Sequence, residues 1–403
     1  MLTKITLLGD MMCEPLMLKA AKRGNTYCFD EVFENIRALL DESDCVIGNL
    51  ETPLAGEKAG FTNSLFSFNT PDAFADAVKN AGVDMVLAAN NHCLDRGVGG
   101  LVRTARVLKE KDLPFAGICE TPDERKEAAY LDVNGLKVAV VSYTYGTNYF
   151  ANRIKLEGER QHLVNLLRPQ NEFYYVPKKT APPPLHKRAV NRILRKIPEE
   201  KRYYVKRILG MTVNTAHADD SLNKETAEPY LAQMREDLTA ARGKADLVLF
   251  CPHVGGQFNS EPGAFSKYVF EQAAPCGCDA IIASHAHVAL KAELLNGIPC
   301  FYSLGNLSMS PNSVYLLHEN LPDYGLAVHL YVEGKKIRKT TFSVLIITEE
   351  KGKMLTVWPA DRFYAECNEK QKREVERHIQ QIVFTVSGKK MTESIVQHEY
   401  LLG

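Results

Sequence analysis

The chain has 403 residues, of which 45% are hydrophobic, and 49 Lys or Arg residues balance 49 Asp or Glu residues. This composition favours a sizeable buried core over extensive disorder, and the balanced charge gives no sign of a nucleic-acid partner or a global affinity for acidic polymers. The length suits one large α/β domain or two ordinary domains.

The first residues lead directly into a predicted strand and do not resemble a signal peptide, and no run of 18 apolar residues occurs. We therefore expect no transmembrane helix. The ten cysteines are scattered through apolar contexts, so we expect them to be reduced and the protein to be cytoplasmic.

Seven short apolar runs along the chain are each followed at once by polar residues. In chain order they cover residues 5–8, 45–47, 85–89, 138–141, 247–251, 280–283 and 300–302. Runs of this length predict strands that are buried on both faces. Amphipathic stretches at 71–81, with Thr70 as its cap, and at 101–111 predict helices. Strands that alternate with helices predict an α/β fold, in which ligands gather at the carboxyl ends of the strands.

Residues 150–225 lack strand periodicity, and residues 151–210 contain 15 Lys or Arg against 5 Asp or Glu. Four tyrosines are interleaved with this charge: Tyr174, Tyr175, Tyr203 and Tyr204. We interpret the region as an insertion with a solvated basic face; the alternatives are a lid over the site or a contact with an anionic substrate or a membrane surface. Further along, 326–332 and 337–347 predict strands and 366–384 predicts a helix.

Six side chains with metal-binding atoms stand at the ends of separate predicted strands: Asp10, Glu51, Asn91, His253, His285 and His287. Carboxylates, an amide oxygen and imidazoles together suit Mn, Fe or Zn better than Ca or Mg alone. A carboxylate can bridge two cations, and two histidines two positions apart project to the same side of an extended backbone. Each residue alone has a plain alternative as a helix cap or a loop residue, so it is their joint occurrence that predicts a metal site.

His92 directly follows a candidate ligand, so its side chain diverges from that ligand and can face a substrate as a general acid. Four further side chains lie beside the candidate ligands at the same predicted sheet edge: Asn49, Tyr143, Asn148 and Asn306. They are candidates for hydrogen bonds to substrate, and turn-forming Asn and core Tyr are equally good interpretations.

Seven motifs in this order carry a resemblance to a known family. They are Gly9-Asp10, Asn49-Leu50-Glu51, Ala89-Asn90-Asn91-His92, the stretch Ser142 to Asn148, His253-Val254-Gly255, His285-Ala286-His287 and Tyr302-Ser303-Leu304-Gly305-Asn306. Their order and spacing resemble the CapA family, a branch of the calcineurin-like metallophosphoesterases that is associated with poly-γ-glutamate capsule synthesis. The resemblance covers most of the first 350 residues apart from the basic region.

The resemblance implies a four-layer sandwich in which two central mixed β-sheets are flanked by helices. It implies a CapA-like domain over residues 1–360, interrupted at about 150–225, and we expect a helical extension at 361–403. It also implies two divalent ions: Asp10 would bind the first, Glu51 would take the bridging position, and Asn91 would bind the second. The three histidines would complete the metal shell, and His92 would protonate the leaving group.

Met12 departs from the superfamily pattern, which usually has histidine there, and a thioether is a poor ligand for these cations. The first site is therefore expected to be weak unless Cys13 contributes. Val254 and Gln257 stand where the family usually has tryptophan and glutamate. We expect metal-dependent hydrolysis of a phosphoester or a γ-glutamyl amide in a small or polymeric anionic substrate. The alternative is a non-catalytic metal-binding or assembly factor in polyglutamate biosynthesis.

Overall fold

A nine-stranded mixed sheet forms one half of the fold in the computed structural model, which describes residues 2–172, 194, 197–208 and 219–402. Its parallel half consists of β1 (Leu2–Met11), β4 (Cys45–Leu50), β5 (Met85–Leu87) and β6 (Phe115–Ala116), with β13 (Asn306–Ser308) parallel to the end of β1. Its antiparallel half consists of β14 (Tyr324–Glu333), β15 (Lys336–Thr348), β16 (Thr356–Pro359) and β17 (Tyr400–Leu401). The two halves meet where β14 pairs with β1.

A second, six-stranded mixed sheet faces the first. Its order is β11 (Ala292–Leu295), β12 (Ile298–Phe301), β10 (Ala280–Ile282), β9 (Leu247–His253), β8 (Leu136–Thr144) and β7 (Ala129–Val133). The four central strands are parallel, and the two edge strands β11 and β7 are antiparallel to their neighbours. The seven apolar runs in the sequence thus all form strands, three in the nine-stranded sheet and four in the six-stranded sheet.

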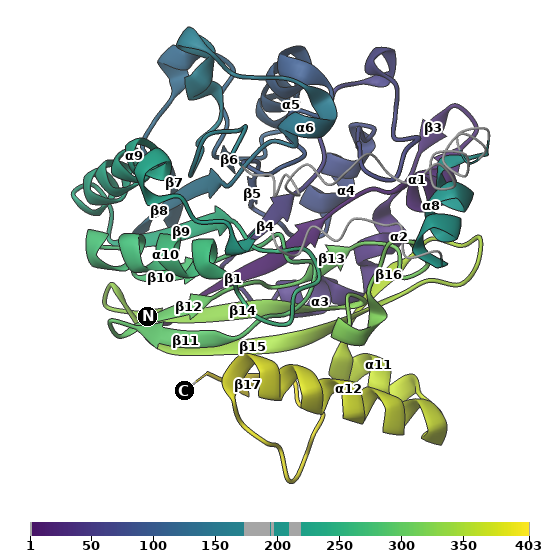
Figure 1. The fold of residues 1–403 in the computed structure, drawn as a ribbon. Helices are drawn as coiled ribbons and strands as arrows, with labels where there is room; N and C mark the ends of the chain where they lie inside the picture. Colours follow the sequence, from purple (N-terminus) through teal and green to yellow (C-terminus); the bar gives the residue numbers. More distant parts are fainter. Residues whose placement is uncertain (1, 173–193, 195–196, 209–218, 403) are drawn as a thin grey trace.

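Helices cover the outer faces of both sheets, which makes four layers (Figure 1). Ile5 and Leu7 of β1 share a buried cluster with Val138 and Val140 of β8, because alternate strand residues point to the same face. The outer face of the six-stranded sheet packs on α9 (Lys224–Arg242) and α10 (Ala264–Ala273). The nine-stranded sheet packs on α1 (Pro15–Ala21), α2 (Asp30–Phe33), α3 (Arg37–Leu40) and α4 (Ala73–Asn80). The predicted α/β architecture of two mixed sheets flanked by helices is confirmed.

The two helices predicted from amphipathic stretches are present with shifted starts. The first is α4, and the second is α5 (Gly97–Glu110), which begins four residues before the predicted start at position 101. The prediction that Thr70 caps α4 is wrong: the cap position is Asp72, which makes no side-chain cap hydrogen bond, and the Thr70 hydroxyl lies 2.6 Å from the Thr52 hydroxyl. The Thr70 hydroxyl thus pairs with a buried hydroxyl and not with the backbone at the start of α4.

The predicted helix near the end of the chain is α12 (Glu369–Ser387), which follows α11 (Ala360–Glu366). Asn368 and Gln371 form a capping box that fixes where α12 begins. Ile379 and Val383 of α12 lie in the same buried cluster as Phe342 of β15, so this helix completes the core between the sheets. Figure 1 shows α12, in yellow, lying along β15. The domain boundary after residue 360 stays a prediction.

Only part of the basic region is described. It contains α6 (Tyr149–Asn152) and α8 (Glu199–Ile208), and Tyr203 of α8 packs against Phe66 and Tyr315, with ring centroids 5.6 Å and 6.5 Å apart. Tyr174 and Tyr175 lie outside the described residues, as do residues 173–193, 195–196 and 209–218 of the predicted insertion. The interpretation of this region as a solvated insertion or a lid therefore stays a prediction.

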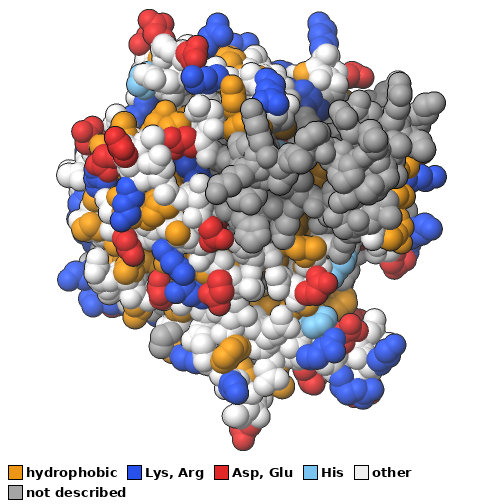
Figure 2. All heavy atoms as spheres, viewed as in Figure 1, with side chains coloured by type: hydrophobic (Ala, Val, Ile, Leu, Met, Phe, Trp, Pro, Cys, Tyr) orange, Lys and Arg blue, Asp and Glu red, His pale blue; other side chains and the backbone are white. Residues whose placement is uncertain are grey.

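Smaller elements connect these layers. A hairpin is formed by β2 (Lys22–Arg23) and β3 (Thr26–Tyr27), and short 3-10 helices occur at Glu34–Ile36, Glu57–Ala59, Pro122–Glu124, Gly158–Leu163, Ala274–Cys276 and His318–Asn320. Acidic and basic side chains are interspersed over the described part of the face in Figure 2. Among the helices that the structure describes, none has the length and apolar composition needed to cross a membrane.

Candidate metal centre

The predicted metal ligands meet between the two sheets, at the carboxyl ends of their parallel strands. Asp10 belongs to β1 and Glu51 directly follows β4, both in the nine-stranded sheet. From the other sheet, His253 ends β9, and His285 and His287 follow β10. All five side chains are buried, and both carboxylate residues are 0% exposed.

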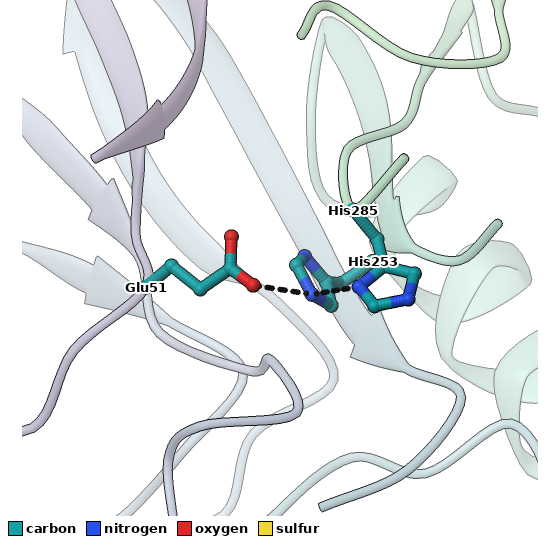
Figure 3. Close-up of side chains that lie close together, drawn as sticks. All are labelled: Glu51, His253 and His285. Carbon is teal, nitrogen blue, oxygen red and sulfur yellow. Dashed lines mark hydrogen bonds and ion pairs between the residues drawn. The ribbon is translucent and has the colours of Figure 1, made fainter. Parts of the chain in front are cut away.

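Glu51, His253 and His285 form the first group of possible ligands, drawn in Figure 3. Glu51 Oε1 lies 3.3 Å from His253 Nε2, and His253 Nε2 lies 3.1 Å from His285 Nδ1. One ligand atom from each residue lies within 4.8 Å of the other two. The three side chains point towards one another from opposite sheets, as donors around one cation must do.

Asp10, Glu51 and His287 form a second group, and their ligand atoms also lie within 4.8 Å of one another. His287 Nδ1 is 3.2 Å from Asp10 Oδ2, and His287 Nε2 is 3.8 Å from Glu51 Oε1. Glu51 is therefore shared by both groups. This is the position of a carboxylate that can contact two cations at once.

The residues present fit a bound cation. Glu51 Oε1 is buried and accepts no hydrogen bond, which is costly for a carboxylate oxygen unless a cation lies beside it. The close approach of His253 Nε2 and His285 Nδ1 likewise places two potential donor nitrogens side by side. Carboxylate and imidazole donors together suit a divalent transition ion.

Charges inside the site shift the pKa values of its members in opposite directions. Burial lowers the pKa of His285 well below its ordinary value, and the neighbouring imidazoles of His253 and His287 lower it further. For His287 burial also acts downward, but the carboxylates of Glu51 and Asp10 outweigh it and raise the pKa to about 9. For Asp10 burial acts upward, but the hydrogen bond and charge of His287 leave the pKa below its ordinary value. Without an ion, His287 thus supplies the positive charge that the two carboxylates attract.

The backbone at both histidines after β10 is unusual. His285 has φ 109° and His287 has φ 56°, in the region that non-glycine residues seldom adopt. The intervening residue, Ala286, is fully buried against the outer helices. This turn directs both imidazoles to the same site, and strained backbone of this kind concentrates at functional sites.

Asn91 and His92 diverge as expected from their adjacency. Asn91 Oδ1 lies 2.8 Å from His253 Nε2, which places the amide oxygen beside the first group of ligands. His92 Nδ1 lies 2.7 Å from Asp95 Oδ2, and this carboxylate also accepts the Phe68 amide at 2.7 Å. The Phe68 ring packs against the His92 ring at 4.5 Å.

Three of the four predicted substrate contacts are packed against the ligands themselves. Asn49 donates to Asp10 Oδ1 at 2.7 Å, and Asn306 Oδ1 lies 2.9 Å from His287 Nδ1. Asn148 accepts from the Asn91 amide at 3.2 Å. Such contacts orient ligands and fix which ring nitrogen faces an ion.

The structure does not bring Tyr143 to the other candidates. Its hydroxyl donates to Asp237 of α9 at 2.5 Å and lies 3.1 Å from Arg125. Its strand position turns it to the outer face of the six-stranded sheet, where it shares a cluster with the covering helices. The prediction of a substrate contact is therefore wrong for Tyr143.

Three side chains at the site escaped the sequence analysis. Tyr145 packs its ring 4.5 Å from that of His285, Ser284 Oγ lies 2.9 Å from His253 Nδ1, and Asp95 orients His92. Asp95 is three residues beyond His92, a spacing that suits contact across one turn. That spacing is the signal that could have identified it.

Cys13 lies outside both groups of possible ligands. Met12 is buried in the cluster that also contains Tyr145 and Phe258, whose rings pack against His285 and His287. Cys13 is buried in the outer core of the nine-stranded sheet. Burial raises the pKa of the Cys13 thiol, which disfavours the thiolate that binds metal. The suggestion that Cys13 replaces the missing histidine therefore has no support among the described residues.

Comparison with known proteins gives consistent matches. The family described as bacterial capsule synthesis protein PGA_cap matches residues 4–310. Capsule biosynthesis protein CapA of Bacillus anthracis is 25% identical over 305 residues, which cover 75% of this chain and 58% of that protein. PGA biosynthesis protein CapA of Bacillus subtilis (strain 168) is 21% identical over 300 residues, which cover 74% of this chain and 61% of that protein.

The chain thus matches less than two thirds of the length of either relative. Among solved structures, TT1561 of Thermus thermophilus aligns with 84% of this chain and 98% of its own chain, at 10% identity and a TM-score of 0.37.

Proposed function

The chain belongs to the bacterial capsule synthesis protein family, and on that premise we propose that it is a metal-dependent hydrolase with a dinuclear site. The observation that carries the proposal is the buried Glu51 Oε1, which accepts no hydrogen bond and belongs to both groups of possible ligands. Two divalent ions held there would polarise the substrate and make a nucleophilic hydroxide available near neutral pH. Mn, Fe and Zn are the ions that this donor set favours.

His92 supplies the proton in this proposal. Its Nδ1 faces the Asp95 carboxylate at 2.7 Å, so the neutral ring carries its proton on Nδ1 and leaves Nε2 as the nitrogen that can exchange a proton with substrate. When His92 is protonated, Nε2 can donate to the leaving group as that bond breaks. The 4% exposure of His92 keeps this proton shielded from bulk water.

The proposed substrate is anionic, either a phosphoester or a γ-glutamyl amide. Two relatives are named for capsule or PGA biosynthesis, which favours the γ-glutamyl bond by analogy. Metal activation and a positioned acid serve either reaction, so the distinction depends on the substrate that the site accepts. We also propose cytoplasmic residence and contact of the basic region with anionic polymer or membrane lipid, which cell fractionation would test.

A non-catalytic metal-binding or assembly factor in polyglutamate biosynthesis is the second candidate. Met12 favours it, because a thioether stands where the superfamily usually has histidine and is a poor ligand for these cations. The His92–Asp95 pair favours the enzyme, because a protein that only holds metal has no use for an oriented acid.

The test is the metal content of protein purified without chelators, combined with hydrolysis assays. We expect about two ions per chain, loss of both in Glu51→Gln, and loss of one in His285→Ala. The exposed His318 offers a matched control, and His318→Ala should keep both ions. Hydrolysis of bis-p-nitrophenyl phosphate or γ-glutamyl-p-nitroanilide that disappears in His92→Asn at full metal content supports the enzyme. Two ions without hydrolysis of any phosphoester or γ-glutamyl compound supports the assembly factor.

A further inference from the structure

A cavity of about 650 Å³ opens between the two sheets at their edge strands β6 and β7. None of the residues proposed to bind metal lines it. Phe115, Ile118, Ala128 and Val140 supply apolar walls. A second hollow of about 460 Å³ shares Asp123 and His162 with the first, so the cleft continues along the surface.

The inner end of the cleft is polar. Ser142 Oγ is buried and makes no hydrogen bond, and Asn165 lies beside it, donating to the Ser142 carbonyl at 3.1 Å. An unpaired buried hydroxyl costs free energy unless a ligand or water satisfies it. This end of the cleft therefore offers a hydrogen-bonding position to a polar group.

Gly117 lines the inner end of the cleft, where a larger residue would fill the space. It has φ +96°, and a Cβ there would lie 2.4 Å from the Ala89 Cβ and 3.0 Å from Ser142 Oγ. Ala89 precedes Asn90 and Asn91, so the cleft ends against the back of the segment that leads to the metal centre. The two sites are neighbours that share no lining residue.

The mouth of the cleft carries charges of both signs, most of which are already paired. Arg125 pairs with Asp237 at 2.5 Å, and Lys109 pairs with Glu124 at 2.7 Å. Glu127 pairs with Lys244 at 2.7 Å. Asp123 and Lys126 are exposed and form no ion pair with any residue that the structure describes. One carboxylate and one ammonium group thus remain for a ligand.

We propose that this cleft binds an amino acid or a short peptide. The ammonium group of the ligand meets Asp123 and its carboxylate meets Lys126, because a zwitterion satisfies both unpaired charges without adding net charge. The aliphatic part lies on the apolar walls, and a polar tip reaches Ser142 and Asn165. The continuation of the cleft gives room for more than one residue. This binding is independent of the metal chemistry proposed above.

Isothermal titration calorimetry of the full chain with L-glutamine, L-glutamate and glycylglutamate tests the proposal. We expect at least one probe to bind with a Kd below about 1 mM, and at least about tenfold more tightly than glutarate or butylamine, each of which lacks one of the two charges. Asp123→Ala and Lys126→Ala should each weaken binding about tenfold or more. Asp41→Ala and Lys351→Ala remove exposed charges elsewhere and should leave binding unchanged.

Binding must also persist after chelator treatment and in Glu51→Gln, because neither change touches the cleft. Loss of binding in either case would place the ligand on the metal ions and overturn the proposal. So would the absence of binding for all three probes at about 10 mM, or binding that survives both Asp123→Ala and Lys126→Ala. Ser142→Val removes the hydroxyl that the polar tip of the ligand meets, so it should weaken the binding of every probe that binds the natural chain.

Discussion

Replacing Glu51 with Gln tests the shared carboxylate most directly. The change keeps the shape of the side chain and removes one buried negative charge from both groups of possible ligands. Glu51 Oε1 accepts no hydrogen bond, and an unsatisfied buried acceptor costs about 1–3 kcal/mol. A neutral amide is much less costly to bury than a carboxylate, and Asp10 remains to pair with the positive charge of His287 at 3.2 Å. In the metal-free protein we therefore expect Glu51→Gln to raise the free energy of unfolding by about 1–3 kcal/mol.

When ions are present, we expect Glu51→Gln to lower the free energy of unfolding. An ion that binds only the folded chain stabilises it by about 2.7 kcal/mol at a concentration one hundred times its Kd. Two such ions give the natural chain a gain of about 5 kcal/mol, and Glu51→Gln should lose nearly all of it. For a chain of 403 residues, 1 kcal/mol corresponds to a shift in Tm of only about 1 °C, so unfolding in urea is the better measurement.

The assay is therefore urea unfolding followed by circular dichroism, with chelator and with excess Mn²⁺. Glu57 is an exposed glutamate away from the site, and Glu57→Gln serves as the matched control, with no change expected in either condition. The reasoning is refuted if Glu51→Gln is less stable than the natural chain in chelator. An unchanged stabilisation by Mn²⁺ in this variant would refute it as well.

Three further changes probe other parts of the molecule. Asp95→Asn should lower any hydrolysis rate by about 10²–10⁴-fold at unchanged metal content, in steady-state assays with metal analysis. Asp237→Ala leaves the partly buried Arg125 charge without its carboxylate, so urea titration should show a loss of about 3–5 kcal/mol. Burial raises the pKa of Glu399, but hydrogen bonds from two hydroxyl groups and from Lys4 lower it to about 2. Its contribution to the free energy of unfolding is thus complete above the ordinary pKa of 4.5 and is lost as the pH falls towards 2. In acid unfolding, Glu399→Gln should therefore lose less stability over this pH range than the natural chain does.

Each of these outcomes has a contradicting result. Equal losses of metal and rate in Asp95→Asn would mean that this carboxylate supports the metal centre and not the acid. Tyr143→Phe removes one hydroxyl from the same network and should cost only about 1 kcal/mol; a loss as large as that of Asp237→Ala would contradict a charge effect. Parallel acid unfolding of the natural chain and Glu399→Gln would exclude Glu399 as the titrating group.

The arrangement of the metal ligands was predictable because parallel strands bring their carboxyl ends to one edge. Residues at or just beyond the carboxyl ends of separate strands, such as Asp10, Glu51 and His253, therefore had to meet once the strands were identified. Their detailed pairing was less accessible. The family resemblance implied Glu51 as the bridging member, but strand order alone does not, because that role depends on distances of a few ångströms between the two sheets.

Tyr143 shows where the sequence misleads. Its motif lies at the end of β8, but strand alternation turns its side chain towards α9, and only the packing of that helix reveals which face is which. The partners of β1 were likewise hidden, because the pairing of β1 with β14 joins distant parts of the chain. The residue type of Thr70 suggested a helix cap, but its hydroxyl pairs with the buried Thr52 hydroxyl, a contact that the sequence pattern does not reveal.

The pairing of β1 with β14 has a consequence for how the protein is made. Thr6 and His329 are in contact across 323 residues of chain, so β1 leaves the ribosome long before the strand that covers one of its edges exists. Until then that edge presents unpaired backbone groups to other nascent chains and to chaperones. Asp10 lies near the end of this same strand, and the histidines that meet it come from residues 253–287, so the metal centre is assembled only after most of the chain has been synthesised.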